Sequence, residues 1–269
     1  MSEIRFKSFA SGSSGNCYFF GLFDDGRHPV ASVVVDAGMG VRRLRQELFA
    51  EGLSPADCHA LLVTHDHMDH ICSLSAWCRS LRLPVWMPPR LLEVLSRRRQ
   101  TARSLVPVAR PLPAGEWTEI IPGLVGVRWF EVPHDASQTV GYRIDLGGHR
   151  IAVMTDIGQM TPEALAAARE AETLIIESNY EPEMLAHGHY PPELQARIRG
   201  GNGHLSNGEC AAALREVLHP QLRNVFLCHL SENNNTPELA LQESAEALSG
   251  SAVRLVALPR TQASEFFVL

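Results

Sequence analysis

The densest group of chemically reactive side chains lies in the segment THDHMDH, residues 64–70. It carries the pattern H-x-H-x-D-H, formed by His65, His67, Asp69 and His70, directly after the apolar run 60–63. Imidazole nitrogens and a carboxylate packed this closely suit Zn²⁺, Mn²⁺ or Fe. A strand that ends in a tight loop before a helix would bring all four side chains together. The segment therefore predicts a metal site, and a polar turn with surface histidines is the alternative.

Four residues cannot fill the coordination shells of two ions, so further ligands are expected on other loops. His134 follows the apolar run 127–132, Asp156 follows the run 151–154, and His229 follows the run 225–228. Active-site residues of sheet-based α/β proteins lie at strand ends, on loops held by a rigid scaffold. We therefore expect these three side chains to join the group at His65.

Short apolar runs that alternate with helical segments would supply this scaffold. Helices are expected after three capping sequences, Thr161-Pro162, Ser206 with Glu209, and Thr236-Pro237. The sequence contains no linker and no repeat, which predicts a single domain over residues 1–269. The expected strands are 4–9, 17–23, 31–35, 60–63, 124–132, 139–146, 150–154, 173–176, 224–228 and 253–257.

The composition is that of an ordinary globular protein: 269 residues, 45% hydrophobic, with a formal net charge of −6. No apolar run reaches the length of about 18 residues that a membrane span needs. The first residues lack the apolar core of a signal peptide. The six cysteines are scattered without a C-x-x-C pair, so we expect reduced thiols in a cytoplasmic protein.

Charge is unevenly distributed along the chain. Segment 79–110 has eight arginines and one acid, whereas segment 156–193 has eight acids and one base. A basic face on an acidic protein can bind nucleic acid. We expect the arginines at 97–99 and Arg103 to contact its backbone, and a solvated helix face is the alternative.

The order of the metal motif, then His134, Asp156 and His229, resembles the metallo-β-lactamase-fold hydrolases. Further motifs are similar to the YycJ/WalJ group of bacterial nucleases, and this resemblance covers nearly the whole chain. Ile157 departs from the threonine expected there, which removes one hydrogen bond behind the ligands. The motifs are SGSSGN at 11–16, VDAG at 35–38, TDIG at 155–158, ESNY at 177–180, GHLSN at 203–207 and LSENN at 230–234.

The resemblance implies an αββα sandwich, two mixed sheets flanked by helices, with two divalent metal ions (Zn or Mn) between the sheet edges. His65, His67 and His134 would hold the first ion. Asp69, His70 and His229 would hold the second, and Asp156 would bridge both. Two such ions about 3.5–4 Å apart share a hydroxide of lowered pKa that can attack a phosphodiester. Because Asp69 would hold one of the ions that share the hydroxide, it is expected to be both a ligand and a catalytic residue.

Several loop residues are expected around the ions. His204 is the candidate for phosphate contact or general acid. Asp36 is expected to orient a ligand imidazole. The Gly/Ser loop at 11–16 can offer N–H groups to a phosphate or support the ligands. The expected substrate contacts are Ser13, Ser14, Asn16, Ser206, Asn207 and Asn233.

These expectations combine into a dinuclear phosphodiesterase that acts on nucleic acid, and we expect a DNA exonuclease of the 5′–3′ type in repair or replication. The same chemistry on a tRNA 3′ end, a cyclic phosphodiester, a thioester or a lactone is the alternative. A thioester hydrolase would not need the arginine surplus at 79–110. A non-catalytic binding module is a third reading, which the complete ligand set disfavours. The sequence leaves the oligomeric state open.

Overall fold

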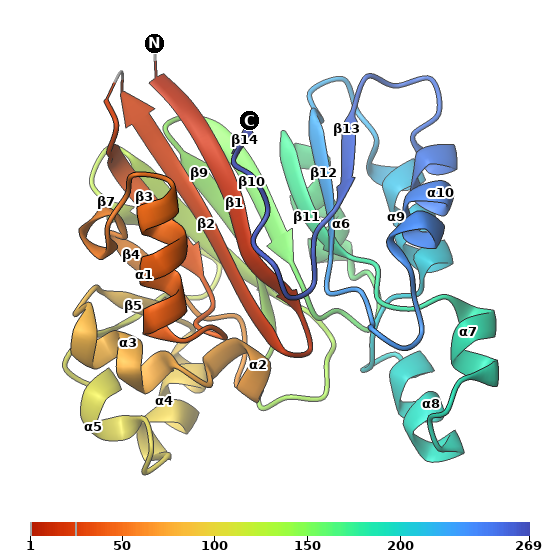
Figure 1. The fold of residues 1–269 in the computed structure, drawn as a ribbon, viewed down its shortest axis with the longest axis horizontal. Coiled ribbons are helices and arrows are strands. Elements are labelled where there is room, and N and C mark those ends of the chain that lie inside the picture. The colour runs from red at the N-terminus through yellow and green to blue at the C-terminus, as the bar shows by residue number, and fades with distance from the viewer. Residues whose placement is uncertain (1, 25) are drawn as a thin grey trace.

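Two seven-stranded mixed sheets pack face to face in the computed structural model, which describes residues 2–24 and 26–269 (Figure 1). The first sheet has the order β14 (Phe267–Val268), β1 (Ser2–Gly12), β2 (Gly15–Asp24), β3 (Pro29–Val35), β4 (Ala60–Leu62), β5 (Val85–Met87), β6 (Ala109–Pro111). The second has the order β13 (Arg254–Ala257), β12 (Asn224–Cys228), β11 (Thr173–Glu177), β10 (His149–Met154), β9 (Val140–Leu146), β8 (Val125–Glu131), β7 (Thr118–Ile121).

Each sheet combines antiparallel hairpins with parallel strands. Strands β1 to β3 and β7 to β10 pair antiparallel, whereas β3 to β6 and β10 to β13 pair parallel. The parallel strands of one sheet end at the same edge, so the loops that follow them gather there.

Helices cover the outer face of both sheets, which confirms the expected αββα sandwich (Figure 1). With the first sheet lie α1 (Val41–Ala50), the short helix η1 (Pro55–Asp57), α2 (Met68–Ile71), α3 (Leu74–Ser80), α4 (Pro89–Arg97) and α5 (Ala102–Leu105). With the second lie α6 (Pro162–Glu170), α9 (Asn207–Val217) and α10 (Pro237–Ala247). Between β11 and α9 the chain forms α7 (Pro182–His187) and α8 (Pro192–Arg199).

Side-chain alternation in the strands divides the core into layers. On β12, Val225 and Leu227 point towards the helices, and Phe226 and Cys228 point between the sheets. Because successive side chains of a strand point to opposite faces, a strand buried on both faces reads as a continuous apolar run. This explains why these strands were predictable from sequence.

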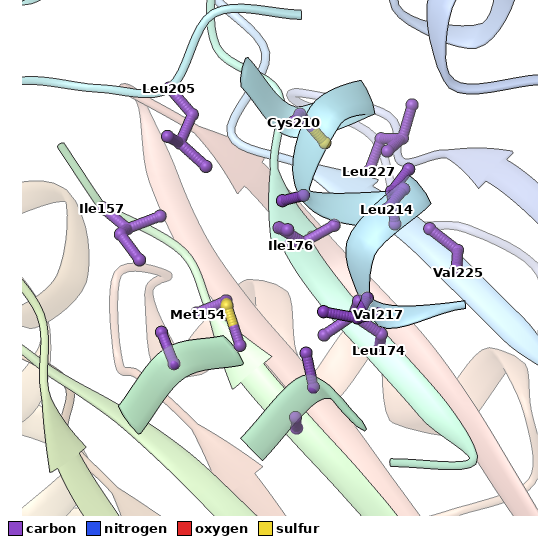
Figure 2. Close-up of a cluster of buried hydrophobic side chains, with 14 of the residues drawn as sticks. Met154, Ile157, Leu174, Ile176, Leu205, Cys210, Leu214, Val217, Val225 and Leu227 are labelled. Carbon is purple, nitrogen blue, oxygen red and sulfur yellow. The ribbon is translucent and has the colours of Figure 1, made fainter. Parts of the chain in front are cut away.

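The outer layer of the second sheet shows the matching helical spacing. Helix α9 packs Cys210, Leu214 and Val217 onto the sheet, where they meet Leu174 and Ile176 of β11 (Figure 2). The spacing of four and three residues keeps these side chains on one face of the helix.

All ten expected strands are present, and their ends agree to within three residues. The sequence did not indicate β5, β6, β7 and β14, which have two to four residues each. The three expected caps are confirmed: Thr161 and Thr236 accept hydrogen bonds from backbone N–H groups, and Ser206 forms a capping box with Glu209.

The six cysteines all carry free thiols, and five of them are buried. No helix among residues 2–24 and 26–269 is both long and apolar enough to cross a membrane.

Candidate metal centre and adjoining pocket

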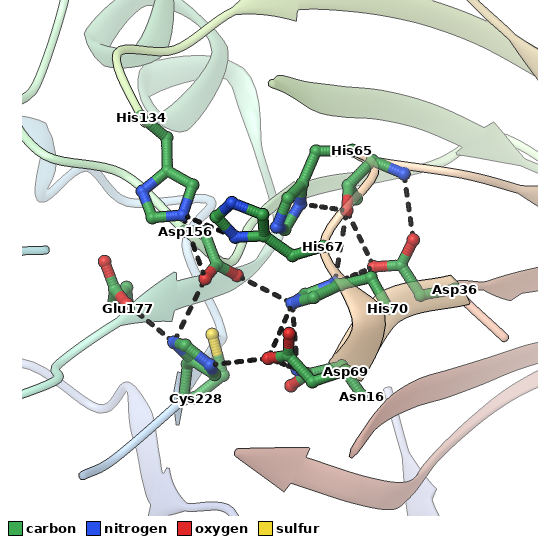
Figure 3. A network of polar contacts seen from close by, with 12 residues as sticks. Asn16, Asp36, His65, His67, Asp69, His70, His134, Asp156, Glu177 and Cys228 are labelled. Carbon is green, nitrogen blue, oxygen red and sulfur yellow. Dashed lines mark hydrogen bonds and ion pairs between the residues drawn. The ribbon is translucent and has the colours of Figure 1, made fainter. Parts of the chain in front are cut away.

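Loops from both sheets bring the seven expected ligands together. The segment with His65, His67, Asp69 and His70 follows β4 and contains α2. The other three, His134, Asp156 and His229, follow β8, β10 and β12 of the second sheet. Figure 3 shows the labelled side chains from these loops pointing towards one shared space.

Three imidazoles form the first group. One ring nitrogen each from His65, His67 and His134 lies within 4.8 Å of the others. His134 Nδ1 lies 2.8 Å from the Gly203 carbonyl oxygen, so it carries the proton and Nε2 keeps its lone pair. That Nε2 lies 3.3 Å from Nδ1 of His67. His65 Nε2 is buried without a hydrogen-bond partner among the described residues.

Asp69, His70 and His229 form the second group, also within 4.8 Å. The Nε2 atoms of His70 and His229 each lie 3.4 Å from Asp69 Oδ2. Asp156 lies between the groups, with Oδ2 3.1 Å from His70 Nε2 and Oδ1 3.6 Å from His134 Nε2.

The donor set fits divalent cations. Asp156 Oδ2, His65 Nε2 and His229 Nε2 are buried and form no hydrogen bond among the described residues, because Asp156 Oδ2 meets His70, and His229 Nε2 meets Asp69, only in ion-pair contacts. Buried polar atoms in folded proteins nearly always have partners, so three converging exceptions call for a cation. Nitrogen and carboxylate ligands in this arrangement suit zinc or manganese.

The electrostatics of the site agree with this reading. Burial lowers the pKa of His65 and keeps its imidazole neutral. Burial also disfavours charge on His229, but Asp156, Asp69 and Glu177 outweigh it and raise the pKa of His229 to about 10. Without a metal, protons therefore balance the carboxylates, and a cation would take their place.

Asp36 holds the second group from behind. Its Oδ2 accepts a hydrogen bond from His70 Nδ1 at 2.7 Å, which leaves the lone pair of this imidazole on Nε2, the nitrogen that faces Asp69 and Asp156. Its two oxygens also accept from the backbone N–H and the hydroxyl of Thr64, both at 2.8 Å. The backbones of Asp36 and His229 have φ of 66° and 53°. This left-handed conformation is costly for such residues and is typical of functional sites.

The loop at 11–16 supports the ligands. Asn16 is fully buried, and its Nδ2 lies 3.2 Å from Asp69 Oδ2 and 2.9 Å from His70 Nε2. Gly38 packs between this loop and the ligand segment so closely that a Cβ on it would lie 2.5 Å from the Asn16 backbone nitrogen and 1.7 Å from the Asp69 carbonyl oxygen. The expected substrate contact at Asn16 is therefore replaced by contacts with the ligands themselves.

Glu177 is a site residue to which the sequence pattern assigned no role. It is fully buried at the end of β11. Its Oε1 accepts from Nδ1 of His204 at 2.7 Å and from Nδ1 of His229 at 2.8 Å. Its Oε2 accepts from the N–H groups of Ile157 and Leu205 at 3.0 and 3.2 Å. The side chain of Ile157 itself lies in the apolar core and makes no such bond.

A pocket of about 180 Å³ adjoins the ligands. His204 and His229 form one wall, and Tyr190, Leu194 and Ile198 from the α7–α8 region form the other. An apolar cavity of about 150 Å³ is known to hold one benzene ring. The pocket therefore offers room for one ring-sized group beside the ligand cluster.

The remaining expected substrate contacts separate into two sets. Ser13 and Ser14 are exposed, and Ser13 lines the pocket. Asn233 is exposed and donates to the Tyr190 hydroxyl at 3.1 Å.

Ser206 and Asn207 lie inside the fold instead. Ser206 caps α9. Asn207 is fully buried and bonds to Ser178 and Asn235. Both residues therefore stabilise the fold, and neither has the substrate contact that we expected.

The chain as a whole is similar to known proteins. The family model described as "Beta-lactamase superfamily domain" matches residues 31–229. The chain is 29% identical over 249 residues to exodeoxyribonuclease YycJ of Bacillus anthracis, covering 91% of this chain and 89% of that protein.

Two solved structures show the same fold. The metallo-β-lactamase fold protein YhfI of Bacillus subtilis superposes with a TM-score of 0.70 at 14% identity, covering 99% of this chain and 100% of that chain. Zn²⁺-bound PqqB of Methylobacterium extorquens superposes with a TM-score of 0.67 at 18% identity, covering 97% and 99%. The chain belongs to the β-lactamase superfamily and is a hydrolase of the metallo-β-lactamase fold.

Proposed function

We propose that this hydrolase is a dinuclear metal-dependent phosphodiesterase that removes nucleotides from DNA, as a 5′–3′ exonuclease in repair or replication in the cytoplasm. One observation carries the proposal: seven ligand side chains, three with unpartnered buried atoms, surround a space beside a pocket that His204 lines. The similarity to YycJ, an exodeoxyribonuclease by name, supports the choice of substrate.

Two cations would occupy the two ligand groups, with Asp156 between them. When bound, such ions supply an activated water and neutralise phosphate charge. The chain's own residues hold and orient them. Asp36 fixes His70, Gly203 fixes His134, and Glu177 fixes His229, each through Nδ1 of the imidazole ring, which leaves Nε2 for a cation.

His204 would hold the proton for the leaving oxygen. Its Nδ1 is bound to Glu177, so Nε2 is the nitrogen left for a substrate in the pocket. Burial alone would lower the pKa of His204, but the Glu177 carboxylate outweighs it and raises the pKa. The imidazole therefore stays protonated at higher pH than a free histidine, as a general acid requires.

The pocket would take the terminal nucleotide. Tyr190 offers a ring on which a base can stack, and stacking accepts any base. An exonuclease needs this tolerance because each base of the strand must pass through the site in turn.

The test is the product pattern on end-labelled DNA. The purified protein, loaded with Mn²⁺ or Zn²⁺, is given single- and double-stranded DNA, RNA, a thioester and a small chromogenic phosphodiester. Release of mononucleotides from the 5′ end supports the proposal. Turnover of the thioester without cleavage of nucleic acid would favour the alternative substrate class.

Metal content tests the ligand assignment separately from activity. We expect two ions per chain by elemental analysis after dialysis. Asp69→Ala should abolish cleavage, reduce metal content and keep the circular dichroism of the fold. Glu119→Ala, which removes an exposed carboxylate on β7, serves as the control. An Asp69→Ala protein that cleaves DNA at the unmutated rate would refute the assignment.

A further inference from the structure

A groove of about 640 Å³ on the first half of the chain is lined by four arginines, Arg79, Arg82, Arg103 and Arg110. All four side chains are exposed. Arg79 lies in the last turn of α3, and Arg82 follows that helix. Arg103 lies on α5, and Arg110 lies in the edge strand β6. The floor between them includes Pro84 and Val108.

These four arginines are free of ion pairs within the part of the chain that the structure describes. The segment 79–110 contains four more arginines, and the structure separates two of them from the groove. Arg97 pairs with Glu93, and Arg98 pairs with Asp66 beside the metal motif. Of the arginines at 97–99 and Arg103, which were expected to contact a nucleic-acid backbone, only Arg103 lines this groove.

Four like charges around one groove repel each other, and they lie on a chain whose net charge is −6. An anionic ligand relieves this repulsion and gains from the focused positive potential. Arginine suits phosphate in particular because its planar guanidinium donates two parallel hydrogen bonds. The groove is also too large for a single small anion and spreads its charges over three elements.

The groove lies away from the ligand cluster. His65 follows the carboxyl end of β4, whereas Pro84 and Val108 precede the amino ends of the parallel strands β5 and β6. Figure 1 shows α3 running from α2 towards α5 on that side of the molecule. The seven residues of α3 span about 10 Å, and the three residues of β5 also span about 10 Å. These two lengths set the separation between the groove and the ligand cluster.

We propose that this groove binds the sugar–phosphate backbone of the nucleic-acid substrate several nucleotides away from the bond that is cleaved. The inference rests on the proposed function. A separation of about 10–15 Å corresponds to roughly three to four nucleotides of axial rise along one strand. The groove would thus hold the strand in place while its terminal nucleotide occupies the pocket at Tyr190.

The test compares two double variants with the same change in net charge. Arg79→Glu with Arg103→Glu alters the groove. Arg42→Glu with Arg45→Glu alters two exposed arginines of α1 and is the control. Thermal unfolding establishes that both variants fold. Binding of a fluorescent 20-nucleotide DNA is measured by anisotropy in EDTA, so that no cleavage is needed.

The groove variant should bind this DNA at least tenfold more weakly than the control variant. Loss of two phosphate contacts should reduce the slope of log K against log salt by about 1.4 for a single strand or about 1.8 for a duplex. The ratio of long-DNA turnover to turnover of a small chromogenic phosphodiester should also fall at least tenfold. The groove variant should still cleave a dinucleotide at the rate of the control variant, because a dinucleotide is too short to reach the groove.

Equal affinity and equal salt slope in the two double variants would overturn the inference. So would a groove variant that loses binding to a poly-glutamate peptide but keeps DNA binding, since the groove would then fit an acidic protein. Failure of the proposed function would give a different result: the unmutated protein would bind DNA but cleave only a substrate that is not a nucleic acid.

Discussion

Replacing Glu177 by glutamine is expected to destabilise the protein and to change the pH dependence of its activity. The side chain is fully buried, and it touches both a ligand, His229, and the proposed proton donor, His204. Glutamine keeps the shape of the side chain and removes only its charge and one acceptor. The variant therefore isolates what the carboxylate contributes.

The contacts set the magnitude. Four N–H donors meet the carboxylate, two from the imidazoles on Oε1 and two from the backbone on Oε2. An amide has one oxygen, so in either orientation its NH₂ group faces two donors. Each unsatisfied buried donor costs about 1–3 kcal/mol. Breaking a buried charge pair costs about 3–5 kcal/mol. Two unsatisfied donors therefore cost about 2–6 kcal/mol and the broken charge pair about 3–5 kcal/mol, so we expect the free energy of unfolding to fall by about 3–5 kcal/mol.

The pH effect has a definite sign. Because the Glu177 carboxylate overcomes burial and raises the pKa of His204, its removal should lower that pKa. A general acid must be protonated, so activity is lost as pH rises through its pKa. The alkaline limb of the pH profile should therefore move to lower pH in Glu177→Gln, with the largest loss of rate above neutrality.

Urea unfolding of the metal-free protein measures the first effect, and kcat/KM between pH 5 and pH 9.5 measures the second. Glu209→Gln is the matched control, since glutamine also completes a capping box and should change stability by about 0.5 kcal/mol or less. An unchanged urea midpoint together with an unchanged alkaline limb in Glu177→Gln would refute the reasoning.

Three further predictions concern the ligands and the pocket. Carboxylates offset burial and raise the pKa of His229 to about 10 in the metal-free protein, so Mn²⁺ must displace a proton below that pH. Affinity should rise with pH with measurable proton release, whereas the stability of the metal-free fold should fall as pH rises from about 6.5 towards 10. Calorimetry in two buffers that showed no proton release would contradict this. Gly38→Ala places a Cβ 1.7 Å from the Asp69 carbonyl oxygen. It should lower the free energy of unfolding by about 1–3 kcal/mol, measured by urea unfolding, and weaken metal binding, measured by titration. Unchanged values in both measurements would contradict the packing argument. Tyr190→Ala should raise KM for DNA about 10- to 100-fold through lost stacking, with Tyr190→Phe nearly unaffected; equal KM values in the two variants would exclude stacking.

The local part of the site was predictable from sequence because it is contiguous. Four of the seven side chains lie within six positions, and the strand before them is a plain apolar run. His134, Asp156 and His229 could be found because a polar residue just past a buried strand must lie at a sheet edge. The structure brings all seven together.

Glu177 also follows an apolar run, 173–176, so the same rule applied to glutamate would have indicated its position, although not its role. Its position at the end of an apolar run looks like an ordinary strand end. Only the parallel pairing of β11 with β12, which aligns Glu177 with Cys228, places it beside His229. Burial by segments distant in sequence explains two further outcomes: Asn16 supports the ligands, which was one of the two roles expected of its loop, whereas Asn207 bonds inside the fold and does not face a substrate.

The Glu177 carboxylate couples the ligand group to the proton donor. A single oxygen, Oε1, accepts from Nδ1 of both His204 and His229. Both imidazoles therefore carry their proton on the nitrogen that faces Glu177, and both present Nε2 in the opposite direction. On His229 this leaves a lone pair for a cation, and on His204 it leaves the titrating nitrogen beside the pocket. One buried carboxylate thus fixes two different roles on two identical side chains, which is why its replacement should affect metal binding and proton transfer together.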